Sequence, residues 1–444
     1  MDQGPLGILA CAGSLPIEIA EAARRAGRPV HIVGIEGFAE PGIAAYSHTT
    51  HNIGQVGGIL SSLKRAGCRQ LVIAGALRRP NLLKVRVDHG FFRAIGTVLR
   101  LTRGGDDSVL RRVVHFFERE GFEVVGVDRI APHLLAPAGT LGRIEPSPAS
   151  ARAMARASSL LRALGAFDVG QGVVATEQRI IAIEGVHGTD EMLAQVQSAG
   201  EAIGCAGAPL STHGAVLVKM PKPGQELRID LPTIGPRTVE RAHACGLAGI
   251  VVAAGRAQVL ERARTMAMAD EQGLFVVGME GAREPEATAA PAILSAAETF
   301  RTLGRVRAAA AERRDAALGA RALAVLAAHG AGRAVVVVGE HVQGMDGALG
   351  IRRLLGGRRT SHWGLRAFKR RIGVLVVSAA EDVGTDAASI EAVLALVGRA
   401  GLAGIAVGNR EGCAAPLAEL LTSAADRRRL FIMVPGTPDG GGTP

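Results

Sequence analysis

Aromatic side chains are scarce in this chain of 444 residues: Phe, Tyr and Trp together make up 3%, and Trp and Tyr occur once each. Proteins that recognise single-stranded nucleic acids commonly stack the bases on aromatic side chains. The scarcity therefore argues against a nucleic-acid partner. Hydrophobic residues still make up 48% of the chain and charged residues 21%. The chain can thus form cores, which must consist mainly of Ala, Val, Leu and Ile.

Paired cysteines and long apolar runs are also missing. The five cysteines lie far apart and form no C-x-x-C pair, which is typical of a reducing compartment and argues against a disulfide framework or a structural zinc site. No apolar run is long enough to span a bilayer. The short run over residues 6–12 has no basic segment before it, so we interpret it as a strand and not as a signal peptide. These features predict a soluble, cytoplasmic protein.

The net charge of +10 is concentrated in one segment. Residues 352–371 contain eight Lys and Arg residues and no acid, together with Trp363 and Phe368. The rest of the chain is close to neutral, so the charge does not imply that the whole protein binds nucleic acid. This basic segment could attach the protein peripherally to the anionic inner membrane, where each basic residue contributes about 1 kcal/mol. The alternative is a solvated face of a structural unit.

Residues 1–132 alternate between apolar strands and helices. A strand over residues 7–13 enters a small-residue turn, and a helix is expected over residues 14–26, with Ser14 as its N-cap and Gly27 after its end. Strands and helices continue to alternate beyond it. This pattern predicts βαβ units in a Rossmann-like α/β domain with a parallel sheet. A linker rich in Pro, Gly and Ala is expected next, over residues 133–148.

Two positions in this domain are candidates for phosphate binding. The turn at Gly13 and Ser14 opens a helix, and helix N-termini favour anions. The turn lacks the G-x-G-x-x-G pattern of dinucleotide-binding proteins. Arg78 and Arg79 follow an expected strand, and ligands of open α/β sheets bind at the carboxyl ends of strands. The alternative for both arginines is a solvated surface position.

The most concentrated polar chemistry lies in residues 215–236. An apolar strand over residues 215–218 leads into Lys-Met-Pro-Lys-Pro-Gly, whose prolines fix φ and remove backbone donors, so neither a strand nor a helix can continue. A shaped loop is expected, with four charged residues: Lys219, Lys222, Arg228 and Asp230. Cations beside one carboxylate suit a phosphate-bearing substrate, with or without a metal ion. A surface turn with a scattered ion pair is the alternative.

The remaining chain predicts two further α/β units and the segments around them. We expect an α/β domain over residues 149–281 and an Ala- and Arg-rich helical connector over residues 282–319. A third unit should follow over residues 320–435, and a flexible tail over residues 436–444.

The third unit repeats motifs of the preceding domain in the same order and with similar spacing. The clearest repeat is Gly-Leu-Ala-Gly-Ile, at residues 246–250 and again at residues 401–405. We therefore expect a degenerate second copy of the domain. In this alignment Val377 replaces Lys219 and Asp346 corresponds to Asp190. Asp382 would correspond to Asp230 if the loop is shortened.

Six motifs in order give the chain a resemblance to a known family. They are Gly-Ser-Leu-Pro at 13–16, Arg-Gly-Gly-Asp-Asp at 103–107, Leu-Ala-Pro-Ala-Gly at 135–139, Asp-Val-Gly-Gln at 168–171, Glu-Gly-x-x-Gly-Thr-Asp-x-Met-Leu at 184–193, and Lys-x-Pro-Lys-Pro-Gly-Gln-x-Leu-Arg-x-Asp-Leu-Pro-Thr-Ile-Gly-Pro at 219–236. From residue 7 onward, through the α/β domain, the chain resembles the LpxI family of UDP-2,3-diacylglucosamine pyrophosphatases of lipid A biosynthesis. It departs from the family at residues 10–12, where a glycine-rich turn is expected, and in its additional third unit.

The resemblance implies a hydrolase that splits the pyrophosphate of UDP-2,3-diacylglucosamine into UMP and 2,3-diacylglucosamine 1-phosphate, with Mg²⁺ as cofactor. It implies Asp230 as the essential acid and as a candidate metal ligand, and the charges of Lys219 and Lys222 suit catalysis beside it. Substrate would contact both domains through Gly13, Ser14, Arg78, Arg79, Gln171, Thr189, Asp190 and Arg228.

Two alternatives to this interpretation stay open. Thr189 and Asp190 open a helix, where such residues are often caps. The whole cleft could also belong to a non-catalytic protein that binds a nucleotide sugar or a lipid. A homodimer is compatible with the sequence.

Overall fold

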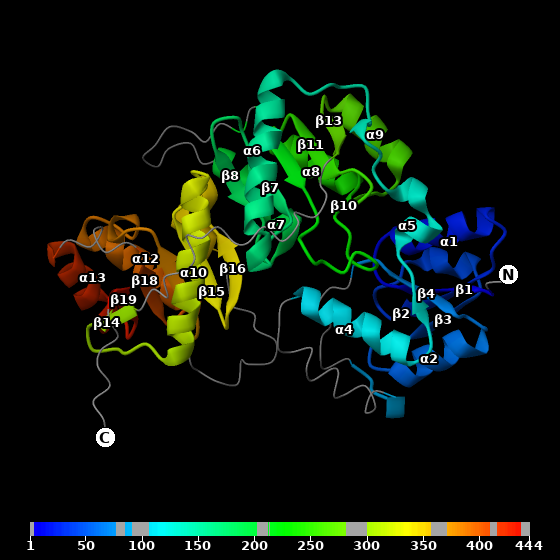
Figure 1. The fold of residues 1–444 in the computed structure, drawn as a ribbon, viewed down its shortest axis with the longest axis horizontal. Coiled ribbons are helices and arrows are strands. Elements are labelled where there is room, and N and C mark those ends of the chain that lie inside the picture. The colour runs from blue at the N-terminus through cyan, green and yellow to red at the C-terminus, as the bar shows by residue number, and fades with distance from the viewer. Residues whose placement is uncertain are drawn as a thin grey trace.

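The computed structural model describes residues 4–76, 85–90, 106–201, 212, 214–280, 300–356, 371–408 and 415–436. They form three α/β units, which we call the N-terminal unit (residues 4–134), the middle unit (residues 137–280) and the third unit (residues 300–436). The middle unit lies between the other two (Figure 1). Arg78, Arg79, the centre of the basic segment and the expected tail lie outside the described residues.

The N-terminal unit is a parallel sheet with helices on both faces. Its elements are β1 (Leu6–Ala10), α1 (Leu15–Arg25), β2 (Val30–Ile35), η1 (Pro41–Ala45), β3 (His48–His51), α2 (Val56–Arg65), β4 (Gln70–Ala74), α4 (Asp106–Arg119), β5 (Glu123–Val124), α5 (Val127–Ile130) and η3 (Pro132–Leu134). The strand order is β3-β2-β1-β4-β5, and every neighbouring pair is parallel. Helices α1 and α5 share one apolar cluster with the sheet, and α2 and α4 share another. The expected Rossmann-like architecture is confirmed.

The middle unit is built on a mixed sheet. Its elements are β6 (Gly139–Thr140), α6 (Pro148–Leu164), η4 (Gly165–Phe167), β7 (Gly172–Ala175), β8 (Ile180–Ile183), α7 (Gly188–Glu201), β9 (Val216–Lys219), β10 (Thr233–Ile234), α8 (Pro236–Ala244), β11 (Gly249–Ala253), β12 (Gln258–Val259), α9 (Arg262–Glu271) and β13 (Phe275–Met279). The strand order is β6-β13-β11-β9-β7-β8, and β10 pairs separately with β12. Strands β9, β11 and β13 are parallel, while β6, β7 and β8 run antiparallel to their neighbours.

The third unit has a sheet of the same design. Its elements are β14 (Phe300–Leu303), α10 (Ala310–Ala328), β15 (Ala334–Val338), β16 (His341–Met345), η6 (Gly347–Leu349), α11 (Gly350–Leu355), β17 (Val374–Val377), η8 (Ala380–Asp382), α12 (Ala387–Arg399), β18 (Gly404–Val407), α13 (Ala415–Arg427) and β19 (Phe431–Pro435). The strand order β14-β19-β18-β17-β15-β16 matches that of the middle unit position by position. The parallel and antiparallel pairings match as well.

The third unit begins earlier than the sequence pattern indicates. Strand β14 and the first half of α10 fall within the expected connector over residues 282–319, yet β14 pairs with β19, and α10 packs on the sheet. A Cβ at Gly319 would lie 2.4 Å from Val376, so this helix approaches the sheet closely. The small residues that looked like low complexity are the ones that allow this packing. Strand β6 likewise lies in the expected linker over residues 133–148 and pairs with β13.

The strand registers show how the two sheets correspond. Gly172 pairs with Lys219 in the middle unit, and Ala334 pairs with Val377 in the third. Val377 therefore occupies the ladder position of Lys219, as the sequence alignment indicates. The third unit carries an aliphatic side chain where the middle unit carries a cation.

The expected match of Asp346 to Asp190 is wrong. The amide of Glu184 donates to the carbonyl of Gly172 (2.8 Å), and the amide of Asp346 donates to the carbonyl of Ala334 (3.1 Å). Asp346 therefore corresponds to Glu184. The alignment by letters failed because it paired a turn, which follows β8, with the strand β16.

Asp346 makes the stability of the third unit depend on pH. Burial raises its pKa to about 6, although amide groups of Ala334 and Arg333 donate to its carboxylate. An unfolded aspartate titrates near pH 3.9, so between about pH 4 and pH 6 the unfolded chain binds fewer protons, and stability falls as pH rises. We expect Asp346→Asn to remove this fall, since the amide oxygen still accepts both hydrogen bonds. The melting temperatures of the two proteins at pH 4.5 and pH 7.5 test it; identical pH dependence would contradict it.

Candidate active site

The loop after β9 is present, and its own side chains close it. Strand β9 ends at Lys219, and the chain then turns through two prolines and Gly224, whose φ of +72° is left-handed. The amide of Lys222 donates to Oε1 of Gln225 (2.8 Å). Nε2 of Gln225 donates to Oδ2 of Asp230 (2.5 Å). Gln225, which the sequence analysis missed, thereby holds Asp230 against the turn that carries Lys222.

Oxygen atoms fix both lysines at this end of the sheet. The side chain of Lys219 is buried, and its Nζ donates to the carbonyl of Thr233 (3.0 Å) at the start of β10. Nζ of Lys222 forms an ion pair with Oδ1 of Asp168 (2.8 Å). Asp168 ends the short helix η4 with a left-handed φ of +50°. The two cations are thus held by different segments, Lys219 by β10 and Lys222 by the segment before β7.

A buried carboxylate, Glu184, completes the cluster. It follows β8, is 5% exposed, and accepts a hydrogen bond from Oγ1 of Thr189 (3.0 Å). Burial raises the pKa of Glu184, and the negative charge of Asp230 raises it further. Three effects lower this pKa: first the charge of Lys219, then the hydrogen bond from Thr189 and the charge of Lys222. Glu184 therefore lies within electrostatic range of all three residues expected to be catalytic. The sequence analysis quoted this glutamate in a motif but did not count it as a site residue.

Two glycines make room for Glu184. A Cβ at Gly172 would lie 2.4 Å from its Oε2. A Cβ at Gly170, whose φ is +57°, would lie 2.1 Å from its carbonyl oxygen. The motif Asp-Val-Gly-Gln-Gly therefore has a structural reason. Gly170 makes room for the backbone of Glu184, Gly172 makes room for its carboxylate, and Asp168 binds Lys222.

Gly172→Ala should displace the Glu184 carboxylate and with it the charge balance around Lys219. We expect the activity of the site to fall between tenfold and a hundredfold, since misplacement by about 1 Å can cost about a hundredfold in rate. The matched control is Ala334→Gly at the same ladder position of the third unit, which should leave activity unchanged. Steady-state kinetics and thermal melting of both variants are the measurements. Full activity of Gly172→Ala would remove Glu184 from the site.

Gln171 and Thr189, two of the residues predicted to bind substrate, lie at the cluster. The carbonyl of Gln171 accepts from the amide of Met220 (2.9 Å), which ties the segment before β7 to the loop. The side-chain Oε1 of Gln171 is buried and has no hydrogen-bond partner among the described residues. Thr189 touches the cluster through Glu184. Both residues therefore lie where they could contact a ligand bound beside the two lysines.

Asp190 points away from the cluster. Its side chain is 55% exposed and forms ion pairs with Arg237 (3.3 Å) and Arg241 (3.5 Å) of α8. Adjacent residues of a helix face different directions, so Thr189 can reach Glu184 while Asp190 reaches α8. The ion pairs of Asp190 connect α7 to α8.

Arg228 connects the middle unit to the N-terminal unit. Its guanidinium donates to Glu226 (2.7 Å) in its own loop and to Glu118 (2.7 Å) of α4. These hydrogen bonds raise the pKa of Arg228 and lower the pKa values of both glutamates. Two carboxylates thus balance the charge that the sequence analysis assigned to substrate. Ile229 packs against the apolar cluster of the N-terminal unit, which strengthens the same connection.

Gly13 and Ser14 also engage in contacts within the protein. Gly13, whose φ is +98°, donates its amide to Glu40 (3.2 Å). The hydroxyl of Ser14 donates to Glu18 (2.7 Å) and does not cap α1. Glu18 in turn accepts from the amide of Glu261 in the middle unit (3.2 Å). This turn therefore lies at the junction of the two units.

The loop that carries Lys222, Arg228 and Asp230 contacts the N-terminal unit through Arg228 and Ile229. The loop between β9 and β10 reaches toward the N-terminal unit (Figure 1). A Cβ at Gly126, before α5, would lie 3.3 Å from the Cα of Arg228. Lys219, Lys222, Asp230 and Glu184 belong to the middle unit, and the turn at Gly13 and Ser14 reaches that unit through Glu18 and Glu261. Such an arrangement can bind an anionic ligand between two domains and stabilise negative charge that develops on it.

Known proteins match the first two units. The LpxI N-terminal domain model matches residues 5–134, and the LpxI C-terminal domain model matches residues 137–277. The UDP-2,3-diacylglucosamine pyrophosphatase LpxI of Caulobacter vibrioides is 39% identical over 281 residues, which are 63% of this chain and 99% of that protein. The third unit lies beyond both matched regions. The chain therefore belongs to the LpxI family.

Proposed function

We propose that the protein hydrolyses the pyrophosphate bond of UDP-2,3-diacylglucosamine, giving UMP and 2,3-diacylglucosamine 1-phosphate in lipid A biosynthesis. The observation that carries the proposal is the cluster of Lys219, Lys222, Asp230 and Glu184, whose loop contacts the N-terminal unit through Arg228 and Ile229. The relative that is 39% identical carries the name of this activity and matches the chain over both units.

The reaction requires charge stabilisation and an oriented water molecule. The oxygen of water forms a bond to one phosphorus atom, the bond from that phosphorus to the bridging oxygen breaks, and the bridging oxygen leaves with the other phosphate. Lys219 and Lys222 would neutralise charge on the non-bridging oxygens as it develops. Asp230, held by Gln225, would orient the water and accept its proton.

Asp230 is also the residue that we propose would hold Mg²⁺. Among the described residues no group of three or more His, Cys, Asp or Glu side chains is arranged to bind a metal. Mg²⁺ commonly uses one or two carboxylates, with waters and substrate phosphates as its other ligands. A single partly exposed carboxylate beside a phosphate site suits that donor set. When bound, the ion would neutralise phosphate oxygens.

We further infer that the third unit is a degenerate copy of the middle unit and does not hydrolyse substrate. Val377 stands at the position of Lys219, so a buried cation is replaced by an apolar side chain. Arg333 forms an ion pair with Asp382 (3.3 Å), the acid that precedes α12 as Asp230 precedes α8. The matching sheet order of the two units supports a duplication.

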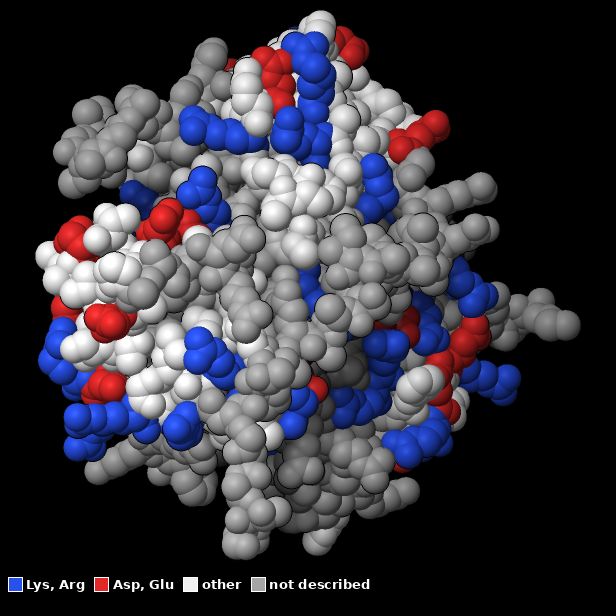
Figure 2. Space-filling model, turned by 60° about the vertical axis from the view of Figure 1, so that its left-hand side comes forward, with Lys and Arg blue, Asp and Glu red and all other residues white. Residues whose placement is uncertain are grey.

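The proposal places the protein in the cytoplasm with peripheral contact at the inner membrane, near its diacylated substrate. No helix in the described part of the chain has the length and apolar character to cross a bilayer. Figure 2 shows Lys and Arg side chains spread over one face, with Asp and Glu among them. Within the basic segment, Arg353 donates to Ser198 and Arg371 donates to the carbonyl of Arg428. Membrane contact would therefore depend on the basic residues between them, and flotation with anionic vesicles tests it.

A direct assay separates the proposed enzyme from a binding protein. Purified protein is incubated with UDP-2,3-diacylglucosamine and Mg²⁺, and UMP release is measured. We expect release that scales with protein concentration and stops when EDTA removes the metal. Binding of the substrate without release of UMP would favour the alternative of a non-catalytic nucleotide-sugar or lipid-binding protein.

A further inference from the structure

The middle and third units match residue by residue before and within their first hairpins. Left-handed backbone conformations recur at one constant interval in the numbering, at Asp168, Gly170 and Gly188 and again at Gly330, Gly332 and Gly350. The hairpins β7–β8 and β15–β16 each carry one extra residue in the second strand, and these residues, Ile181 and Gln343, are separated by the same interval. Equivalent positions can therefore be identified without ambiguity.

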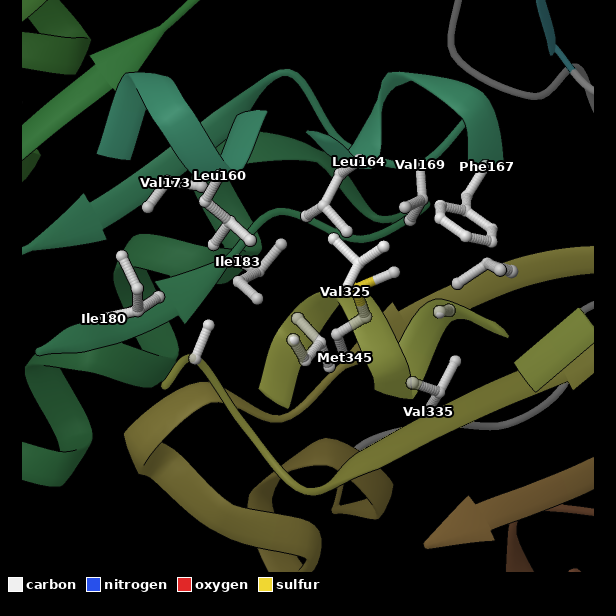
Figure 3. Packing of buried hydrophobic residues seen from close by; sticks show 14 of the residues in the cluster. Leu160, Leu164, Phe167, Val169, Val173, Ile180, Ile183, Val325, Val335 and Met345 are labelled. Atoms are coloured by element: carbon white, nitrogen blue, oxygen red, sulfur yellow. The ribbon is translucent and has the colours of Figure 1, made fainter. Parts of the chain in front are cut away.

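Equivalent residues of the two units belong to one apolar cluster. Helix α6 packs on helix α10, and strand β8 lies against strand β16. Figure 3 shows Leu160, Leu164 and Ile183 of the middle unit facing Val325 and Met345 of the third. At this interval the cluster contains eight equivalent pairs: Leu160 and Ala322, Leu161 and Leu323, Leu164 and Leu326, Val169 and Ala331, Val173 and Val335, Ala175 and Val337, Ile180 and Val342, Ile183 and Met345. The same patch of each unit thus faces the other.

Backbone contacts across the junction are reciprocal as well. The amide of Val186 in the middle unit donates to the carbonyl of Gln343, the extra residue of the third unit's hairpin. In the other direction, a Cβ at Gly347 would lie 2.7 Å from the carbonyl of Ile181, the extra residue of the middle unit's hairpin. Each unit therefore places the segment after its hairpin on the bulge of the other. Such two-way contacts between like surfaces are the mark of a twofold, isologous interface.

We propose that the face formed by α6 and β8 recognises a second copy of the middle unit, and that the third unit occupies this face as a built-in second subunit. The partner that fits the face is the middle unit of this same protein, residues 137–280. The full chain consequently does not pair with another chain through this face. Its pseudo-dimer carries one lysine-containing site and one site without the lysines.

The test begins with the folded full chain. A protease site is inserted within residues 281–299, and the native protein is cleaved and passed over a sizing column with light scattering. Because a subunit-like interface should survive the cut, we expect the two fragments to elute together in a 1:1 complex. The fragments are then separated in urea, and the N-terminal fragment is returned to buffer. It should form a homodimer of twice its own mass.

Two matched variants show whether this homodimer uses the proposed face. Val186→Pro removes the amide that crosses the junction, and Val186→Ala retains it. We expect the dissociation constant of the homodimer to rise about fivefold to a hundredfold in Val186→Pro, because a twofold interface loses one hydrogen bond from each copy, and to stay unchanged in Val186→Ala. A folded monomeric fragment, or equal dimerisation of both variants, would overturn the proposal. A fragment that stays unfolded or aggregates also counts against it, because a fitting second copy would cover the exposed core.

Discussion

Asp230→Asn is expected to abolish the release of UMP from UDP-2,3-diacylglucosamine, with a loss of about a thousandfold or more. Asparagine has nearly the same shape, and its amide oxygen can still accept the hydrogen bond from Gln225. The loop should therefore keep its conformation. What disappears is the negative charge that would orient water and accept its proton. UMP release under saturating substrate, together with a urea unfolding curve, separates lost chemistry from lost folding.

The third unit supplies a matched control for this variant. Asp382 precedes α12 as Asp230 precedes α8, and it forms an ion pair with Arg333, while Val377 stands where the middle unit has Lys219. Asp382→Asn should leave UMP release at the level of the unmodified protein. If Asp230→Asn retains more than about a tenth of the activity, or if Asp382→Asn loses as much, the assignment of the active site is wrong.

Lys219→Met is expected to lower kcat by about a hundredfold or more, since a buried cation would no longer neutralise the reacting phosphate. The strand should persist, because Val377 at the same ladder position of the third unit shows that an apolar side chain fits there. The substitution also removes the charge that most opposes the raised pKa of Glu184. The pKa of Glu184 should then rise further.

This shift has a measurable consequence for stability. A carboxyl group whose pKa is higher in the folded than in the unfolded state makes stability fall as pH rises from the unfolded value toward the folded one. Lys219→Met should steepen that fall, and Lys219→Met combined with Glu184→Gln should remove it. Melting temperatures between pH 4 and pH 8 provide the comparison. Equal pH dependence of the single and double variants would show that Glu184 does not cause the fall. Equal pH dependence of Lys219→Met and the unmodified protein would show that the charge of Lys219 does not act on Glu184.

The sequence predicted the parts of the site that lie close together in the chain. Two prolines and a glycine between Lys219 and Asp230 indicated a shaped loop, and the structure has one. The sequence analysis did not identify Glu184 as a site residue. Its position depends on the pairing of β7 with β8, which no local sequence pattern specifies. The two glycines of Asp-Val-Gly-Gln-Gly could have indicated it, because glycines are required where another residue packs closely against the backbone, as Glu184 does here.

The errors have a common physical cause. Asp346 was aligned by letters, although a turn was thereby matched to a strand. The boundary of the third unit was drawn at the end of an Ala-rich stretch, although alanine and glycine let α10 lie close to its sheet. In each case the direction or pairing of the backbone decided the outcome.

The apolar cluster shared by α6 and α10 makes the stability of the middle unit depend on the third unit, which has Val377 at the position of Lys219. A protein segment without catalytic activity usually accumulates mutations, since selection does not remove them. Here a mutation such as Met345→Asp would place a charge in the apolar cluster that the middle and third units share. Both units would be destabilised, and the cell would degrade the unfolded protein. The third unit is thus preserved by the stability of the unit beside it, and its interior should tolerate substitution no better than an active site does.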